Sequence, residues 1–405
     1  MDDAAGIAEA AARRSYGKLV AFLAARSRDV AGAEDALSEA FASALADWPA
    51  RGVPANPEAW LLTVARRRMV DAVRSRIHAE DAAAHLALLE EVAEPVADAG
   101  IPDERLRLMF VCAHPALAAN VRAPLMLQAV LGFDAAAIAS AFLVAPAAMG
   151  QRLVRAKAKI REAGIAFEVP PRALWPERLD AVLSAIYAAY AEGWSDAEGT
   201  DPQRRNLADE AIWLGRLLAH LLPEEPEALG LLALMLHAQA RRAARRDAAG
   251  SYVPLAQQDP VRWEAGMVDE AEALLLRASR FGRAGRYQLE AAVQSAHAVR
   301  RHGGSPDWGA IVTLYEALYA LAGSPLAALN RAVALAHAGD AAGGWAALEQ
   351  LAGLEDYQPY WAARADLLAR VGRAREAAAA YERAIGLERD PAVRAFLQQR
   401  LAGLR

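Results

Sequence analysis

The chain has 405 residues, enough for two or three domains of ordinary size. Its composition, 55% hydrophobic and 23% charged, is that of a globular protein with large cores. The formal net charge of -5 argues against a uniformly basic protein that coats nucleic acid, so any DNA contact must come from local basic patches.

Alanine and leucine dominate the chain and runs of β-branched residues are scarce, which predicts an all-α fold. The longest apolar stretch, residues 229–238, is far shorter than the roughly 20 residues that a membrane span needs. The first ten residues lack the basic-then-apolar layout of a secretory signal. We therefore expect a cytoplasmic protein with no membrane partner.

Sequence patterns of enzymes and metal sites are missing. The single cysteine, Cys112, leaves no disulfide framework and no cysteine-based zinc site. Cys112 and His114 are two potential ligands without nearby partners, so core packing is favoured over metal binding. No HExxH, GxSxG, GxGxxG or P-loop pattern occurs. We expect no enzyme activity, no cofactor and no metal.

Residues 8–48 are predicted to form one or two helices. The later helix begins at about Ala31 and ends at Trp48, and its first half is acidic. The acidic residues are Asp29, Glu34, Asp35 and Glu39. Acids are favourable near the positive end of the helix dipole, so a solvated helix face is enough to account for them.

A loop over residues 49–57, with three prolines and one glycine, precedes a predicted helix over residues 58–76. This helix carries Trp60 and a group of arginines against one acid, Asp71. The arginines are Arg66, Arg67, Arg68, Arg74 and Arg76. A loop, an aromatic ring and arginines suit single-stranded DNA, because bases stack and the backbone is held by charge. An arginine-rich helix also arises from plain composition, and the residues leave both interpretations open.

An acidic, alanine-rich linker is predicted over residues 78–100. Its composition, with Pro95 as a breaker, is typical of a flexible or weakly helical join between two small domains. The second small domain then runs to about residue 166, before the prolines at 170 and 171.

The helix predicted over residues 146–161 has the pattern of a helix that lies in a DNA groove. Its apolar stripe consists of Met149, Leu153, Ala156 and Ile160. Five basic residues flank this stripe with no acid among them. A short helix and a tight turn precede it, as in a helix-turn-helix unit whose second helix enters the major groove. The alternative is an amphipathic surface helix with solvated arginines.

From about residue 172 onward the pattern predicts helix after helix. Residues 358–391 have the aromatic and small-residue spacing of one tetratricopeptide-type (TPR) repeat, and residues 324–351 resemble a looser helical pair. Earlier pairs at 177–245 and 265–322 could complete a stack, because at least three repeats are usually needed for stability.

The first 167 residues resemble an RNA polymerase sigma factor of the extracytoplasmic-function (ECF) type, a sigma-70 subfamily that keeps only regions 2 and 4. The matching stretches include AGAEDALSEAFASALADWP, NPEAWLLTVARRRMVDAVRSR and IASAFLVAPAAMGQRLVRAKAKIREAGI. Later stretches, among them NLADEAIWLGRLLAHLLPEEPEALGLLALMLHAQARRAAR and SPLAALNRAVALA, resemble a subgroup with a long helical C-terminal extension.

The resemblance implies a domain order. Region 2, which binds core polymerase and the minus-ten element, would take residues 1–77, followed by the linker 78–100. Region 4, with a helix-turn-helix for the minus-thirty-five element, would take residues 101–167. A helical, TPR-like extension would take residues 172–405 and modulate activity. This extension could also contact the sigma domains of the same chain.

The resemblance also implies the functional residues. Asp35 and Glu39 would dock on the β′ clamp helices of polymerase, whose β flap is a further expected contact. The residues implied for the minus-ten element are Arg66, Arg67, Arg68 and Arg74. Those implied for the minus-thirty-five element are Gln151, Arg152, Arg155, Lys157 and Lys159. The alternative function is a helix-turn-helix regulator or a TPR-type adaptor that does not act as a sigma factor.

Overall fold

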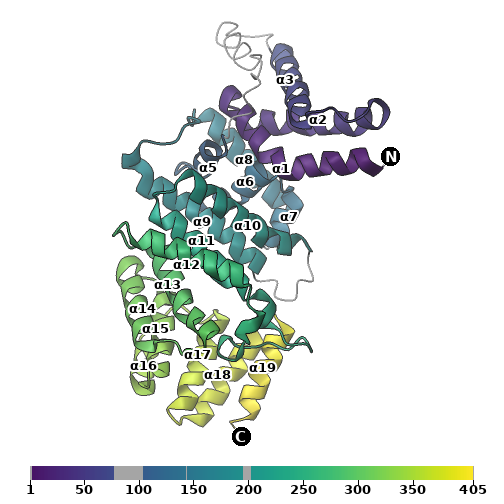
Figure 1. Ribbon diagram of the computed structural model, residues 1–405. Helices are drawn as coiled ribbons and strands as arrows, with labels where there is room; N and C mark the ends of the chain where they lie inside the picture. Colours follow the sequence, from purple (N-terminus) through teal and green to yellow (C-terminus); the bar gives the residue numbers. More distant parts are fainter. Residues whose placement is uncertain (1, 77–103, 143, 195–201, 405) are drawn as a thin grey trace. The chain divides into compact units, whose positions relative to one another are not determined.

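The computed structural model describes residues 2–76, 104–142, 144–194 and 202–404. Every regular element in these ranges is helical, apart from one isolated bridge between Arg246 and Tyr252, so the predicted all-α class is confirmed. The chain divides into two compact units, Met1–Gly193 with Gln203–Ala211, and Trp194–Pro202 with Ile212–Arg405. Figure 1 labels the helices of both. The predicted linker, residues 78–100, lies outside the described residues.

Three helices begin the first unit: α1 (Asp2–Ser27), α2 (Val30–Arg51) and α3 (Pro57–Arg76). Asp29 caps α2, because its Oδ1 accepts a 3.0 Å hydrogen bond from the Gly32 backbone N–H. The ring of Trp48, near the end of α2, meets the ring of Trp60 edge-on at 5.5 Å. This contact ties the end of α2 to the start of α3 and fixes the angle between them.

The loop predicted over residues 49–57 is shorter than expected. α2 continues through Pro49 to Arg51, and α3 begins at Pro57. Pro49 lies in the last turn of α2, where the helix tolerates the missing N–H at a cost. Gly52 ends the helix with a φ of 85°, a conformation that favours glycine.

Four helices follow: α5 (Arg105–Cys112), α6 (Ala119–Leu131), α7 (Ala135–Ala141) and α8 (Pro146–Glu162). The short helix α7 packs directly on α8. The buried residues of α8 are Met149, Leu153, Ala156 and Ile160, so the apolar stripe predicted for this helix is confirmed. Between α7 and α8, residue 143 lies outside the described part of the chain.

Helix α1 packs closely against α5 and α6. A Cβ atom at Gly17 of α1 would lie 1.8 Å from the carbonyl oxygen of Val130 in α6, so only glycine permits this approach. At the end of α6, a Cβ at Gly132 would lie 2.9 Å from Cδ1 of Tyr16. The backbones of α1 and α6 therefore touch, which brings the helices that follow each of them close together.

After η1 (Arg172–Leu174), helix α9 (Trp175–Trp194) is tied to α5 in the same unit. Arg178 Nη2 donates a 3.0 Å hydrogen bond to the carbonyl oxygen of Phe110. The ring of Trp175 lies 6.3 Å from the ring of Phe110 and its Nε1 donates to the Pro170 carbonyl oxygen. Helix α10 (Pro202–Leu221) contributes to both units.

The second unit is a succession of helices in which each packs on the next one described. They are α11 (Pro226–Ala240), α12 (Ala265–Ser279), α13 (Arg286–Ala298), α14 (Trp308–Ala322), α15 (Pro325–His337), α16 (Ala341–Glu349), α17 (Gln358–Arg370), α18 (Ala374–Leu387) and α19 (Pro391–Ala402). The 3-10 segments between them are η2 (Arg242–Arg245), η3 (Leu255–Gln257), η4 (Pro260–Arg262) and η5 (Val299–His302).

The helical pairs predicted near the C-terminus are present. The pair over residues 324–351 is α15 with α16, and the pair over residues 358–391 is α17 with α18. Helices α17 and α18 bury small and aromatic residues against each other, among them Ala365, Ala377 and Tyr381. Gly372 makes the turn between them with a φ of 79°. The naming of these pairs as TPR repeats stays a prediction.

Candidate nucleic-acid and polymerase interface

Helix α8 presents a polar, basic face to solvent. Gln151, Arg155 and Lys159 are exposed and Arg152 is half-buried. The Arg155 Nε donates a 3.3 Å hydrogen bond to the carbonyl oxygen of Gln151, which orients the guanidinium along the helix. Because the apolar stripe is buried on the opposite side, these side chains can reach a ligand without disturbing the core.

The N-terminus of α8 has no side-chain cap. Pro146 is the first helical residue, and Ala145, in the cap position, makes no side-chain hydrogen bond to the helix. The first backbone N–H groups of a helix point outward along its positive dipole end, where they suit an anion such as a phosphate. The α8 start and its basic face are therefore chemically compatible with a DNA backbone.

Lys157 differs from the other basic residues of α8. Its Nζ lies 2.5 Å from Oε2 of Glu34 in α2, and the two side chains are only 13% and 8% exposed. Burial raises the pKa of Glu34, and the ammonium of Lys157 opposes that rise. Among the predicted DNA contacts on α8, Lys157 is thus the one that the structure pairs with another helix of the same unit.

The arginines of α3 have three different surroundings. Arg66 is half-buried, with its guanidinium 5.1 Å from the ring centre of Phe22, and burial followed by the charge of Arg26 lowers its pKa. Arg67 is exposed. Arg74 belongs to the helix, but its side chain lies outside the described ones. Arg67 is therefore the member of the run with the freest approach to a ligand, while Arg66 packs against α1.

Arg68 belongs to the predicted DNA-binding surface of α3 and contacts the predicted polymerase-binding surface of α2. Its Nε lies 3.3 Å from Oε2 of Glu39 in α2, and both side chains are more than half exposed. Asp35 is exposed one turn before Glu39 on the same face of α2. The structure thus places a predicted DNA-contacting arginine beside the acidic strip, Asp35 and Glu39, that is predicted to dock on polymerase.

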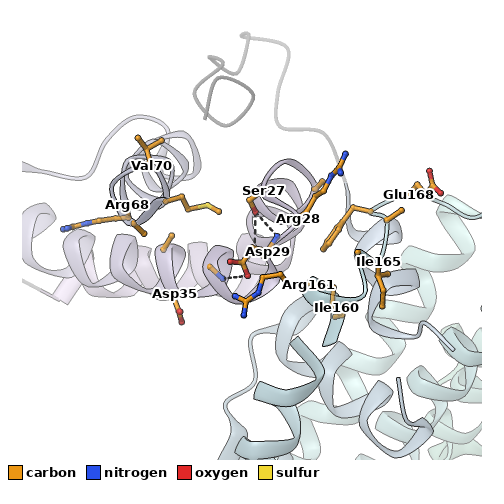
Figure 2. Close-up of a pocket in the computed structure, with 18 of the residues that line it drawn as sticks. Ser27, Arg28, Asp29, Asp35, Arg68, Val70, Ile160, Arg161, Ile165 and Glu168 are labelled. Atoms are coloured by element: carbon orange, nitrogen blue, oxygen red, sulfur yellow. Dashed lines mark hydrogen bonds between the residues drawn. The ribbon is translucent and has the colours of Figure 1, made fainter. Parts of the chain in front are cut away.

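A pocket of about 650 Å³ opens beside this strip. Its walls come from the α1–α2 turn, α2 and α3 on one side, and from the end of α8 and residues 164–168 on the other. Asp35, Glu39 and Arg68 contribute to the first wall, and Arg161 and Ile165 to the second. Figure 2 shows Arg161 and Ile160 reaching from α8 toward the turn that holds Asp29.

Glu34 was predicted to lie on a solvated helix face, without a partner. In the structure Glu34 is buried, and its Oε1 makes no hydrogen bond to the described residues. Its position could have been found from spacing, because it falls on the buried helical stripe with Val30 and Leu37. Its pairing with Lys157, 123 residues away, has no local sequence signal.

Among the residues that the structure describes, no group of three or more potential metal ligands gathers. Cys112 is fully buried in α5, as the packing interpretation predicted. Burial raises the pKa of its thiol far above the usual range. Within the described ranges, no helix is both long enough and apolar enough to cross a membrane.

Comparison with known proteins points to one class. Residues 12–77, which include most of α1 and all of α2 and α3, match sigma-70 region 2. Residues 178–279 match a family of unknown function, DUF6596. The chain is 41% identical over 377 residues to an uncharacterized protein of Rhizobium meliloti (strain 1021), which covers 91% of this chain and 89% of the relative. No solved structure matches the chain.

The chain belongs to the same family as this Rhizobium meliloti protein. Its match to sigma-70 region 2 supports a sigma-70 family sigma factor, a class that initiates transcription with RNA polymerase and does not act as an enzyme. Proteins of that class bind core RNA polymerase and promoter DNA.

Proposed function

We propose that this protein is a sigma factor of the ECF type, with regions 2 and 4 in the first unit and a helical extension that modulates its activity. The observation that carries the proposal is the arrangement of α2, α3 and α8. Within the sigma-70 region 2 match, α2 offers the exposed acids Asp35 and Glu39 and α3 offers Arg67. Outside that match, α8 offers a separate basic face.

In the proposed mechanism, the two basic surfaces have different tasks. The arginines of α3, beside the loop 52–56, hold the separated strand of the minus-ten element by charge and stacking. Helix α8 enters the major groove of the minus-thirty-five element, with Gln151, Arg152 and Arg155 reaching base edges or phosphates. Helix α7, packed on α8, then serves as the first helix of a helix-turn-helix unit.

The acidic strip of α2 supplies the polymerase contact in this proposal. Asp35 and Glu39 lie one turn apart and face solvent, so they can pair with basic residues on the clamp helices of the β′ subunit. Charge pairs of this kind accelerate association and set the register of the partners. The β flap is proposed as a second contact, made by the helices of region 4.

The test is run-off transcription with purified core polymerase on DNA from upstream of the protein's own gene. We expect a discrete transcript that depends on both the protein and the polymerase. A reaction without the protein and a reaction with Arg155→Ala are the controls. Sequence-specific DNA binding by the protein alone, with no transcript in the presence of polymerase, would instead support a helix-turn-helix regulator.

A further inference from the structure

We propose that the loop between α11 and α12, residues 241–264, makes a second contact with core RNA polymerase through Val261 and the arginines around it. This proposal rests on the proposed function, because it gives the extension a means of modulating activity. Four observations within the second unit carry it: the length and internal order of the loop, an exposed valine, two arginines without carboxylate partners, and exposed acids among these residues.

The loop is more than twice as long as any other connection between the helices of the second unit that the structure describes. Connections of this length are uncommon in compact domains and are usually either functional or disordered. This one is ordered, because the Glu264 N–H donates a 2.9 Å hydrogen bond to the Ala240 carbonyl oxygen and joins its two ends. Within it, Oδ1 of Asp247 accepts 2.9 Å hydrogen bonds from the N–H groups of Ala249 and Ser251. An ordered loop loses little conformational entropy when it binds a partner.

Val261, near the end of this loop, is held out in water. It is 89% exposed, more than any other large apolar residue in the described part of the chain. Its position is fixed, because Asp259 caps η4 and its Oδ1 accepts a 3.0 Å hydrogen bond from the Val261 N–H. A single exposed apolar side chain is common on protein surfaces. Val261 is not single, because η4 packs on η5, whose first residue, Val299, is also 38% exposed.

Two arginines in η4 and η5 are held by backbone carbonyl groups and not by acids. Arg262 donates 2.6 Å and 2.5 Å hydrogen bonds from Nη1 and Nη2 to the carbonyl oxygens of Arg246 and Ala243. Arg300 Nη1 donates a 3.1 Å hydrogen bond to the Ala256 carbonyl oxygen. Among the described residues, neither guanidinium has a carboxylate partner. Their positions are therefore fixed while their charges remain uncompensated.

Two histidines near η5 report the same positive charge. Burial lowers the pKa of His297 to about 4, together with the charges of Arg241 and Arg300. Burial also lowers the pKa of His337, and Arg300 is again among the charges that act in this direction. The electrostatic potential around η5 is therefore positive, and it favours a negatively charged group on a partner.

Acidic residues in the same loop favour a protein over DNA as the partner. Asp247, Asp259 and Glu264 are exposed. They would repel the closely spaced phosphates of a duplex, whose backbone also offers no apolar contact to a valine. Protein interfaces typically combine an apolar centre with a polar rim. The loop thus fits a protein with an apolar pocket and with carboxylates opposite Arg262 and Arg300. Core polymerase is the protein that this class of factor binds.

The test is the affinity of the full chain for purified core polymerase, with Val261→Asp and Arg262→Glu as the variants. Each should lower the affinity at least about fivefold at low salt. For Arg262→Glu the loss should shrink as the salt concentration rises, because exposed charge pairs are screened. Leu276→Asp, at a 59% exposed residue of α12, and Arg375→Glu, at an exposed residue of α18, are the matched controls. Both should bind like the parent protein.

Val261→Asp decides the outcome, because Arg262 also holds the loop to its own carbonyl groups and its replacement can loosen the loop. The Val261 side chain lies almost wholly in water, so its replacement should leave the melting temperature of the protein unchanged. Unchanged affinity of Val261→Asp for polymerase would overturn the contact. A loss of affinity in Leu276→Asp of the same size would also overturn it, because the effect would then not be specific to the loop.

Other occupants give different results with the same variants. If Arg262→Glu weakens binding to promoter DNA and neither variant changes the affinity for polymerase, the arginines hold phosphates and the protein contact is wrong. If the parent protein self-associates in sedimentation velocity and only Val261→Asp abolishes this, the occupant is a second copy of the chain. A parent protein that does not bind polymerase refutes the sigma-factor proposal and this contact together. Polymerase binding that responds to Asp35→Lys with Glu39→Lys but not to the loop variants refutes this contact alone.

Discussion

Lys157 and Lys159 are two residues apart on α8, yet one is buried in an ion pair and the other is exposed. Sequence periodicity separates the apolar stripe from the basic residues, and the stripe was predicted correctly. Periodicity does not tell which basic residue meets another helix, because that depends on how α2 and α8 approach. The roles of the basic residues therefore differ in a way that spacing alone could not predict.

Arg155→Ala should weaken promoter recognition and leave the fold intact. Arg155 is exposed and its guanidinium lies along the helix surface, so the free energy of unfolding should change by less than about 0.5 kcal/mol. Loss of a base-contacting arginine should cost about 1 to 3 kcal/mol of DNA binding. Transcription from the target promoter measures the effect. Val154→Ala, at a 64% exposed neighbour on the same helix, is the control.

If Arg155→Ala and Val154→Ala transcribe equally well, α8 does not read the promoter through Arg155. A loss in both variants with a lowered melting temperature would show damage to the fold instead. Arg152→Ala extends the test to the half-buried neighbour, where we expect a similar loss of transcription.

Charge reversal of the acidic strip, Asp35→Lys with Glu39→Lys, should reduce the affinity for core polymerase. Both side chains are exposed, and the exposed pair of Glu39 with Arg68 contributes no more than about 1 kcal/mol to stability. Asp47→Lys, another charge reversal on α2 but outside the strip, is the matched control. A pull-down at moderate salt gives the measurement, and unchanged binding by the double variant would contradict the docking role.

Two histidines, the buried His237 and the half-buried His297, should make the second unit sensitive to acid. Burial, followed by the charge of Arg241, lowers the pKa of both His237 and His297 to about 4. In the unfolded chain the ordinary value of about 6.5 returns, so between these values the unfolded state binds more protons than the folded state. The free energy of unfolding should therefore fall as the pH drops from about 6.5 toward 4, and be insensitive to these groups above pH 7.

Calorimetry of the full chain between pH 7.5 and 5 measures this dependence. His237→Gln should flatten the pH dependence of the melting temperature, whether or not the substitution changes the melting temperature at neutral pH. His302→Gln, at an exposed position, is the control. A pH dependence that is the same in both variants would show that His237 is not a source of acid sensitivity.

At the scale of helices, the all-α class, the helix over residues 146–161 and the pairs near the C-terminus followed from composition and periodicity. The end of α2 did not, because a proline-rich loop was predicted from residue 49 and the helix continues to Arg51. Packing of Trp48 on Trp60 stabilises this last turn by contacts that a local pattern does not contain. The linker 78–100 and its predicted character lie outside the described residues.

Replacing the two prolines that flank the loop should have different effects on the free energy of unfolding. Pro49 lies inside α2, so Pro49→Ala should restore a helical hydrogen bond and raise the free energy of unfolding by on the order of 1 to 3 kcal/mol. Pro57 is the first residue of α3, where proline is favourable, so Pro57→Ala should give no gain. Chemical denaturation of both variants checks this. An equal response would mean that Pro49 does not disturb α2.

At the scale of the whole molecule, helix α9 begins after residue 167, where the sigma domains are predicted to end. Helix α9 packs within the first unit, where Arg178 and Trp175 hold Phe110. Truncation after Ala166 should therefore uncover Phe110 and give a less stable protein than truncation after Trp194. Thermal unfolding compares the two fragments. Equal stability would show that α9 is dispensable for the first unit.

Transcription by the fragment that ends at Trp194 also tests the extension. If the extension modulates activity, the fragment and the full chain should differ at matched concentrations. Identical transcription would show that the residues from 195 onward are not a working part of the proposed sigma factor. The helical succession of this region follows from the sequence pattern, but the role of the region depends on surfaces that helical periodicity does not describe.

Cys112 lies fully buried in α5, and it is the single thiol of a chain of 405 residues. An alkylating reagent can reach its sulfur only when the surrounding helices part, since both access and thiolate formation are blocked by burial. The rate of alkylation therefore measures how often the first unit opens around Cys112, and opening of the second unit does not contribute to it. The protein contains its own probe for following one unit without labelling or mutation.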